Sequence, residues 1–262
     1  MAIEFGNYIY STGTHYIENC GHDENNKYKG GKAGDQTGKE CYLRSWYNRP
    51  WTCVLHYPDP EVRMLIARMA IAAALNNNVG YDQGQRTTFW TALKEANYNP
   101  VMIHTPCEAD CTSSTTAICK GAGYLTDVAG LKNLPLSITS RNMRTQFQKA
   151  GFGVRTLSKY LTSPDYLDPG DILLYENHHA AINVTVGKYG YAAEGQTNVV
   201  ITGNSVWLRT HPAANTPTIA VLHKGEVYPY DNETVDNGSG WFRIKFGNTT
   251  GYVSRRYSRL IK

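Results

Sequence analysis

The spacing of apolar residues changes once along this 262-residue chain, near residue 167. Between residues 59 and 149, apolar side chains recur every three or four positions, which is the pattern of amphipathic helices. From residue 167 onward, short apolar runs alternate with Gly, Asn and Pro turns, which is typical of strands. Helices followed by a series of short strands predict an α+β fold in which helices pack on an antiparallel sheet.

Four helices are expected in the first part of the chain. The first begins cleanly, because Asp59 is a favoured N-cap residue and Pro60 suits the first helical turn. The expected helices cover about 59–76, 85–96, 110–119 and 140–149. Gly121 and Gly123 are expected to end the third helix, since glycine favours the end of a helix. Residues 1–58 show little periodicity and are predicted to be a loop-rich extension.

Short strands are expected on both sides of this helical part. One covers about 51–56, and a second, fully apolar one covers 172–175. A hairpin is predicted from 179–186 and 191–200, with its turn near Gly187.

Residues 201–262 differ in their sequence pattern from the rest of the chain. Five short strands separated by Gly, Asn and Pro turns predict a small β-barrel, so we expect one domain over 1–198 and a second over 201–262. The last part holds eight Lys and Arg against four Asp and Glu, which accounts for the whole net charge of +4. A basic second domain favours an anionic partner such as a cell wall, a membrane surface or nucleic acid.

Cys111 is the cysteine whose position suggests chemistry. The chain has six cysteines, and no secretion signal is visible at its start, so free thiols are expected rather than a disulfide framework. Cys111 follows Asp110 at the start of an expected helix, where the helix dipole and free N–H groups favour a thiolate nucleophile. The alternative is a small buried hydrophobic residue, which is the usual role of a free cysteine.

A histidine that could serve this nucleophile follows 68 positions later. His179 opens a predicted strand, and a cysteine nucleophile needs a base that takes its proton and then protonates the leaving amine. The predicted hairpin would bring Glu194 or Gln196 back beside His179, where either could orient the imidazole. We expect Glu194 in that role, with a solvent-facing glutamate as the alternative.

Three segments in this order resemble the NlpC-type cell-wall cysteine peptidases. They are Asp-Cys-Thr-Ser at 110–113, Leu-Asp-Pro-Gly-Asp-Ile-Leu-Leu at 167–174 and His-Ala-Ala-Ile at 179–182. The resemblance covers roughly residues 100–198 and implies a papain-like fold with a Cys–His pair. Where many family members carry a third histidine, this chain has Tyr-Ala-Ala-Glu at 191–194. The orienting group could therefore be Glu194, Gln196 or a backbone carbonyl.

The segment upstream of the cysteine is similar to the N-terminal part of a phage-borne subgroup of these hydrolases. The similarity rests on the stretches at 31–40 and 46–51 and on Gly-Tyr-Asp-Gln at 80–83. It implies that this part belongs to the catalytic domain. For Gln36 and Asp82, a structural place in a loop is the expected role.

Residues 201–262 resemble bacterial SH3-type wall-binding domains. The matching elements are Val-Trp-Leu-Arg-Thr-His-Pro at 206–212, Lys-Gly-Glu at 224–226, Gly-Trp-Phe-Arg-Ile at 240–244 and Gly-Tyr-Val-Ser at 251–254. The resemblance implies a tether to the wall, with Trp207 and Tyr230 as candidates that contact the wall polymer. Trp241 is expected to pack in the core.

Together these features predict a peptidoglycan hydrolase that resembles a phage endolysin. We expect an endopeptidase that cuts a D-Glu–diamino acid or cross-link amide, with an N-acetylmuramoyl-L-alanine amidase or a non-catalytic wall-binding protein as alternatives. Its partner would be bacterial peptidoglycan rather than nucleic acid, without membrane insertion, and the protein would be a monomer. Without a visible signal peptide, it would be made in the host cytoplasm and reach the wall by phage lysis or non-classical release.

No metal or cofactor is expected. A zinc site is the chemical alternative, because suitable ligand types are supplied by Cys20, His22, Cys41, Cys53, Cys107 and Cys111. No Cys-x-x-Cys pair is present to support it.

Overall fold

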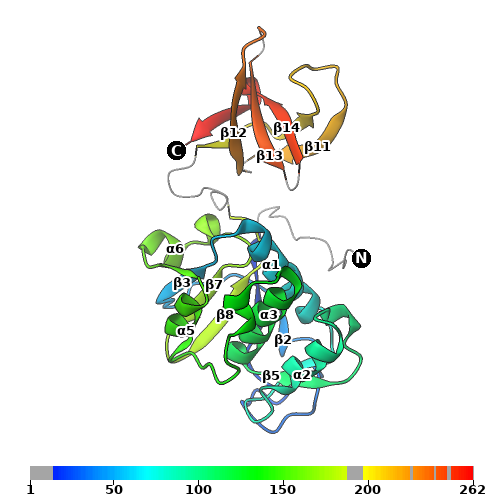
Figure 1. Cartoon of the computed structure of the whole chain (residues 1–262), viewed down its shortest axis with the longest axis vertical. Coiled ribbons are helices and arrows are strands. Elements are labelled where there is room, and N and C mark those ends of the chain that lie inside the picture. Colours follow the sequence, from blue (N-terminus) through cyan, green and yellow to red (C-terminus); the bar gives the residue numbers. More distant parts are fainter. Residues whose placement is uncertain (1–13, 188–196, 225–226, 239, 247–248, 262) are drawn as a thin grey trace. The chain divides into compact units, whose positions relative to one another are not determined.

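The computed structural model describes residues 14–187, 197–224, 227–238, 240–246 and 249–261 (Figure 1). The chain divides into two compact units, Met1–Val186 and Gly187–Lys262. The first combines helices with an antiparallel sheet, and the second is built from strands. The predicted α+β class is therefore confirmed.

A six-stranded sheet forms the centre of the first unit. Its order is β2-β1-β8-β7-β3-β6, and every neighbouring pair is antiparallel. The strands are β1 (Tyr16–Cys20), β2 (Cys41–Ser45), β3 (Cys53–His56), β6 (Gly153–Arg155), β7 (Ile172–Tyr175) and β8 (His179–Asn183). The sequence-based prediction located β3, β7 and β8 but missed β1, β2 and β6.

The β1–β2 pair corrects a second expectation. Antiparallel pairing places Cys20 directly opposite Cys41, and the two form a disulfide. The expectation of free thiols was wrong for this pair, because the 20 residues between the cysteines hide that they are neighbours in a sheet. Both sulfur atoms are buried between the sheet and the helices.

Helices cover one face of this sheet (Figure 1). The larger ones are α1 (Pro60–Ala74), α2 (Thr88–Glu95), α3 (Cys111–Thr126) and α5 (Met143–Lys149). Asp59 caps α1 as predicted, because its carboxylate accepts the N–H groups of Glu61 and Val62. The helix α3 lies centrally, packed against α1, α2 and β8.

The helix α3 is longer than the sequence suggested. It continues through Gly121 and Gly123 to Thr126, and Asp127 in the left-handed region ends it. A Cβ on Gly121 would press on Met69 and Leu93, so the residue is a packing contact rather than a stop signal. Gly123 is similarly close to the backbone after Leu131.

Short elements connect these parts. They are β4 (Val79–Tyr81), η1 (Pro100–Met102), β5 (Cys107–Ala109), α4 (Ala129–Lys132), α6 (Ser158–Thr162) and η2 (Pro164–Tyr166). The strands β4 and β5 are parallel, and β5 leads directly into Asp110 and the start of α3. This small ladder fixes where the catalytic candidate Cys111 begins its helix.

The loop between β1 and β2 is held by carboxylates that accept backbone N–H groups. Asp35 accepts those of Thr37, Gly38 and Glu40, and Asp82 accepts those of Gly30 and Gly84. Gln36 donates its side-chain amide to the carbonyls of Ala33 and Gly34. Gln36 and Asp82 therefore take part in loop structure, as the sequence suggested.

The second unit is a seven-stranded sheet in the order β11-β10-β14-β13-β12-β9-β15. Its strands are β9 (Asn198–Ile201), β10 (Ser205–Arg209), β11 (Thr218–His223), β12 (Val227–Val235), β13 (Trp241–Phe246), β14 (Thr249–Ser254) and β15 (Ser258–Ile261), with η3 (Arg255–Tyr257) before the last. Trp241 is buried, as predicted.

The strand β9 corrects the predicted hairpin. It pairs with β12 and β15, so residues 198–200 belong to the second unit and are not the hairpin partner of β8, which pairs with β1 and β7. The same apolar alternation that predicted a hairpin partner for β8 suits an inner strand of the second sheet equally well. No helix in the part of the chain that the structure describes is long and apolar enough to cross a membrane.

Gly170, in the turn before β7, offers a test of this packing. Its φ is +84°, and a Cβ there would collide with the backbone carbonyl of Arg63. Gly38 has a φ of +69°, and no atom lies within 4 Å of the position that a Cβ would take. Alanine at this position therefore meets only the cost of the left-handed backbone conformation, without a steric clash. We expect Gly38→Ala to lower the free energy of unfolding by about 1–2 kcal/mol, and Gly170→Ala by at least about 3 kcal/mol.

Urea denaturation of the two variants would measure this difference. Equal losses would show that the turn can move away from α1 without cost.

Candidate active site

Cys111 is the first residue of α3 and is half-buried. Asp110 caps the helix: its carboxylate accepts the N–H groups of Thr112 and Ser113, and Ser113 Oγ accepts the Asp110 N–H in return. This capping box satisfies the second and third amides of the helix. The Cys111 N–H is the first amide, which the cap leaves without an intrahelical partner.

Arg86 fixes the cap in place. Its guanidinium donates to both carboxylate oxygens of Asp110, at 2.8 and 3.3 Å, and to the carbonyl of Ile138 at 2.6 Å. Burial would raise the pKa of Asp110, but the hydrogen bonds from Arg86 and Ser113 hold it below its ordinary value. The start of α3 therefore keeps a charged, doubly anchored N-cap beside Cys111.

The structure brings Cys111 to the strand that begins with His179. The backbone of Ala180, the next residue, hydrogen-bonds to the Cys111 thiol. The β1–β8 ladder pairs Ile17 with Asn183 and Glu18 with Ile182, and it does not continue to Ala180. Cys111 therefore meets β8 where its pairing with β1 has ended.

His179 is buried, and its hydrogen-bond partner is Asn19. The Nε2 atom of His179 lies 2.9 Å from Oδ1 of Asn19, which is itself buried on β1. An amide oxygen can only accept, so Nε2 carries the proton and Nδ1 is left as the basic nitrogen. The ring also lies beside Trp51, with 6.1 Å between ring centroids. The expected partners Glu194 and Gln196 lie outside the described residues.

Sequence reasoning missed Asn19 for a physical reason. It lies 160 residues before His179, on a five-residue strand without clear alternation. All but the first residue of β1 are buried, so polar and apolar side chains do not alternate along it. The one available signal was the pair of polar residues at 18 and 19, which stands between the apolar residues at 17 and 20.

The protonation states also differ from expectation. Burial, reinforced by the Asp110 carboxylate, raises the pKa of the Cys111 thiol to about 12. Burial, reinforced by Arg49 and Arg44, lowers the pKa of His179 to about 3. The predicted lowering of the thiol pKa by the helix start is therefore wrong for the free protein, because loss of hydration outweighs the helix dipole. At neutral pH both groups are uncharged.

A buried carboxyl group on β1 also acts on Cys111. Glu18 is 1% exposed, and its Oε1 accepts the hydroxyl of Ser114, on the first turn of α3, at 2.9 Å. Burial raises the pKa of Glu18 to about 7, while the Ser114 hydrogen bond opposes that rise. When Glu18 ionises, its charge further disfavours the Cys111 thiolate.

The two aromatic candidates of the second unit have different settings. Trp207 is 55% exposed, and the Arg209 guanidinium lies 4.3 Å from a ring centroid of its indole. Tyr230 is half-buried, packs edge-on against Phe242 and hydrogen-bonds Thr234. Trp207 is therefore the more accessible of the two.

A family model for the endolysin-like domain matches residues 17–190. This chain belongs to the endolysin-like domain family. The match runs from the second residue of β1 through β8 and includes Asn19, Cys111 and His179. No curated protein matches the chain. Membership indicates a hydrolase of bacterial peptidoglycan in general, since that is the activity of endolysins.

A second polar cluster of this endolysin-like domain joins β3 to the turn before β7. It consists of His56, Asp168 and Asp171, whose ligand atoms lie within 4.8 Å of one another. Positive charge is already supplied there, because the Arg155 guanidinium is 3.5 Å from each carboxylate and Arg63 is 3.9 Å from Asp168. His56 Nδ1 also binds Asp171 at 2.7 Å. The cluster fits an ion-pair network better than a metal site, and it includes none of the cysteines considered for zinc.

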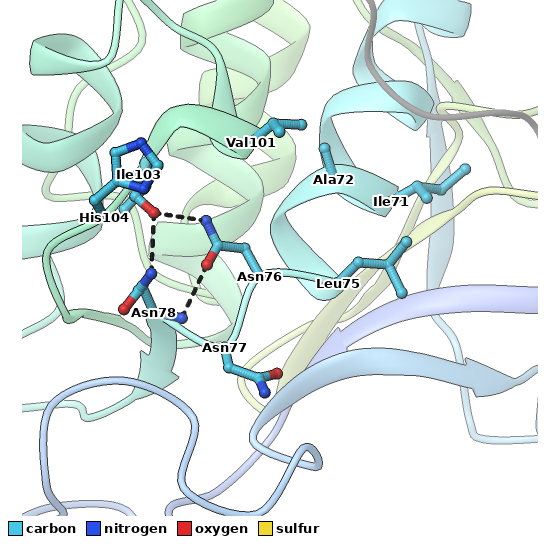
Figure 2. Close-up of a pocket in the computed structure, with 9 residues that line it drawn as sticks. All are labelled: Ile71, Ala72, Leu75, Asn76, Asn77, Asn78, Val101, Ile103 and His104. Atoms are coloured by element: carbon cyan, nitrogen blue, oxygen red, sulfur yellow. Dashed lines mark hydrogen bonds between the residues drawn. The ribbon is translucent and has the colours of Figure 1, made fainter.

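A pocket of about 400 Å³ lies away from Cys111 (Figure 2). Its apolar wall comes from the end of α1 and from Val101, and its polar wall from residues 76–78. Asn76 and Asn78 both donate to the Ile103 carbonyl, so their amides serve the loop itself. The pocket adjoins the start of the β4–β5 ladder, whereas Cys111 follows its end.

Replacing Glu18 by Gln tests the buried carboxyl group. Below pH 4.5 the carboxyl is protonated in the folded and the unfolded chain. Between pH 4.5 and about 7 only the unfolded chain loses the proton, so wild-type stability falls across this window and then levels off. Gln does not titrate and keeps an oxygen for Ser114. The stability of Glu18→Gln relative to wild type should therefore rise by about 3 kcal/mol between pH 4.5 and pH 8.

Urea denaturation at pH 4.5, 6 and 8 measures this difference. Glu95→Gln, at an exposed position on α2, is the matched control for loss of one negative charge. A constant difference between Glu18→Gln and wild type at all three pH values would show that Glu18 ionises normally.

Proposed function

We propose that this protein cleaves an amide bond in the peptide part of peptidoglycan, with Cys111 as nucleophile, His179 as base and Asn19 as orienting residue. The observation that carries the proposal is the convergence of three distant segments. The start of α3 meets β8 through Ala180, and β8 is linked to β1 by the His179–Asn19 hydrogen bond. Membership of the endolysin-like family supports the wall as substrate.

The uncharged state of both groups shapes the first step. Because the free thiol and the imidazole are neutral, the proton passes from Sγ to Nδ1 as the sulfur attacks the carbonyl carbon, rather than beforehand. The C–S bond forms and the carbonyl oxygen becomes an oxyanion. The Cys111 N–H, which the capping box leaves free within the helix, is a suitable donor to that oxygen.

In the breakdown of the intermediate, His179 acts as an acid instead of a base. The imidazolium gives its proton to the departing nitrogen, the C–N bond breaks and a thioester remains on Cys111. Water then attacks the thioester while His179 takes one of its protons. The thiol leaves with that proton as the carboxylic acid product forms, and the acid then ionises in solvent. Asn19 keeps Nε2–H in place throughout, which holds Nδ1 toward the sulfur.

For the bond that is cut, we propose the amide between D-Glu and the diamino acid, or a cross-link amide. The resemblance of residues 110–113, 167–174 and 179–182 to NlpC-type peptidases supports this choice. Cleavage between the sugar and L-Ala, the amidase reaction, would use the same nucleophile and base.

For residues 201–262, we propose wall binding by an SH3-type module. The exposed Trp207, stacked with Arg209, supports it, because an indole beside a cation suits contact with a glycan or peptide. Tethering would raise the enzyme's effective concentration on an immobile polymer.

The central test compares wild type with Cys111→Ala on purified wall. Loss of the nucleophile should abolish wall solubilisation and the release of new amino groups, while the variant should still sediment with intact walls. Mass spectrometry of the wild-type fragments identifies the bond. New amino termini on the diamino acid support the endopeptidase, whereas an intact stem beginning at L-Ala establishes the amidase.

Cys53→Ala is a matched control, because it removes another free cysteine that lies away from α3 on β3. Solubilisation by Cys111→Ala at the wild-type rate would contradict the catalytic proposal and favour a purely wall-binding protein.

Asn19→Ala tests the orienting role. Without the amide oxygen, the imidazole can rotate or adopt the other tautomer, so kcat should fall by roughly 10- to 100-fold, a part of what general acid–base catalysis contributes. KM should change little, because Asn19 lies behind His179 rather than at the substrate. Asn25→Ala, at an exposed loop position, is the control.

Kinetics on a soluble wall peptide separate kcat from KM for both variants. A fall in Asn19→Ala that appears only in KM, or that matches the fall in Asn25→Ala, would rule out the orienting role.

A further inference from the structure

Two arginines that act electrostatically on the candidate base have no carboxylate partner among the residues that the structure describes. Arg44 and Arg49 are absent from the ion pairs formed by the residues that the structure describes. The neighbouring carboxylate of Glu176 faces Arg144 instead, at 3.7 Å. Two guanidinium groups held near each other repel, so this arrangement carries an electrostatic cost that an anion would relieve.

Sheet register places Arg44 on the face of the site. Antiparallel pairing sets Tyr42 opposite Asn19 and Arg44 opposite Ile17, and paired residues share one face of a sheet. Asn19 on this face holds His179. Arg44 therefore lies one repeat along the sheet from the residue that orients the base.

Tyr47 holds both guanidinium groups. The Arg44 guanidinium lies 3.9 Å from its ring centroid, and Arg49 donates to its hydroxyl at 2.8 Å. Arg49 also lies 5.7 Å from the ring centroid of Tyr175, the residue paired with His179 across β7 and β8. Both arginines are half-buried, and both act electrostatically on His179. They are thus preorganised and near the imidazole.

We propose that Arg44 and Arg49 form an anion subsite that binds a free carboxylate of the wall peptide next to the scissile amide. The inference rests on the proposed function and deepens it, since it makes the enzyme selective for acidic stem peptides. Guanidinium groups suit this task because they bind carboxylates through paired hydrogen bonds and stay charged at all relevant pH values. A bound carboxylate would also offset the positive potential that disfavours the imidazolium of the intermediate.

The test uses one preparation of soluble wall peptides divided into two parts. One part is amidated at its carboxyl groups with carbodiimide and ammonia, and the other is mock-treated. Wild type should cleave the mock-treated peptides with a kcat/KM roughly 10- to 100-fold higher, as expected for loss of charge-assisted hydrogen bonds. Arg44→Gln and Arg49→Gln should lose most of this preference by slowing on the mock-treated peptides alone.

Two further variants separate recognition from structure. Arg49→Lys keeps the charge without the paired donors and should retain part of the preference. Lys94→Gln, at an exposed position on α2, removes one positive charge away from the site and should retain it fully.

The outcomes distinguish the two proposals. Equal cleavage of both preparations by wild type would overturn the anion subsite and leave the hydrolase intact. Cleavage of neither preparation, nor of whole wall, would overturn the proposed function itself. The wild-type comparison decides the question even if an arginine variant fails to fold.

Discussion

The arrangement of the candidate site depends on where the pairing of β1 with β8 stops. The two strands are paired at Ile17 and Glu18 but not at Ala180. Beyond that point the backbone of Ala180 hydrogen-bonds to the sulfur of Cys111, and the side chain of Asn19 hydrogen-bonds to His179. If the β1–β8 pairing continued by two residues, β1 would hydrogen-bond to the backbone of Ala180. The sulfur of Cys111, the first residue of α3, would then have no place beside Ala180. The end of the ladder is therefore the place where Cys111 comes to β8, next to His179 and Asn19.

Burial around this point favours uncharged groups in the free protein. Neighbouring charges act in the same direction, because Asp110 and Glu18 disfavour a thiolate and Arg44 and Arg49 disfavour an imidazolium. In the proposed mechanism, charge separation between the sulfur and the ring is therefore delayed until a substrate carbonyl can take up the electron pair. Arg86 has a different part, because it neutralises Asp110 and so limits the cost of placing an N-cap carboxylate beside the nucleophile.

How much the sequence could reveal depended on whether a signal was local. The cap at Asp59, the helix start at Asp110 and the strand at 172–175 carry residue types that specify structure within a few positions, and all three were predicted. The length of α3 was not, because Gly121 contacts Met69 and Leu93 from other helices, and such contacts leave no local pattern. For the same reason β9 was assigned to the wrong sheet, since an apolar strand does not specify its partner.

Cys111 and His179 could be proposed from motifs, but the residue beside the imidazole could not. Its strand, β1, is fully buried after its first residue and lies in a segment whose composition suggested an extension without regular structure. Yet the endolysin-like match begins at residue 17, inside β1. The β1–β2 pair supplies Asn19 and Arg44, is joined by the Cys20–Cys41 disulfide and leads to Arg49 and Trp51. A segment that places Asn19 beside His179 and two arginines near the same ring belongs to the candidate site, because without it α3 and β8 would meet with no hydrogen-bond partner for the imidazole.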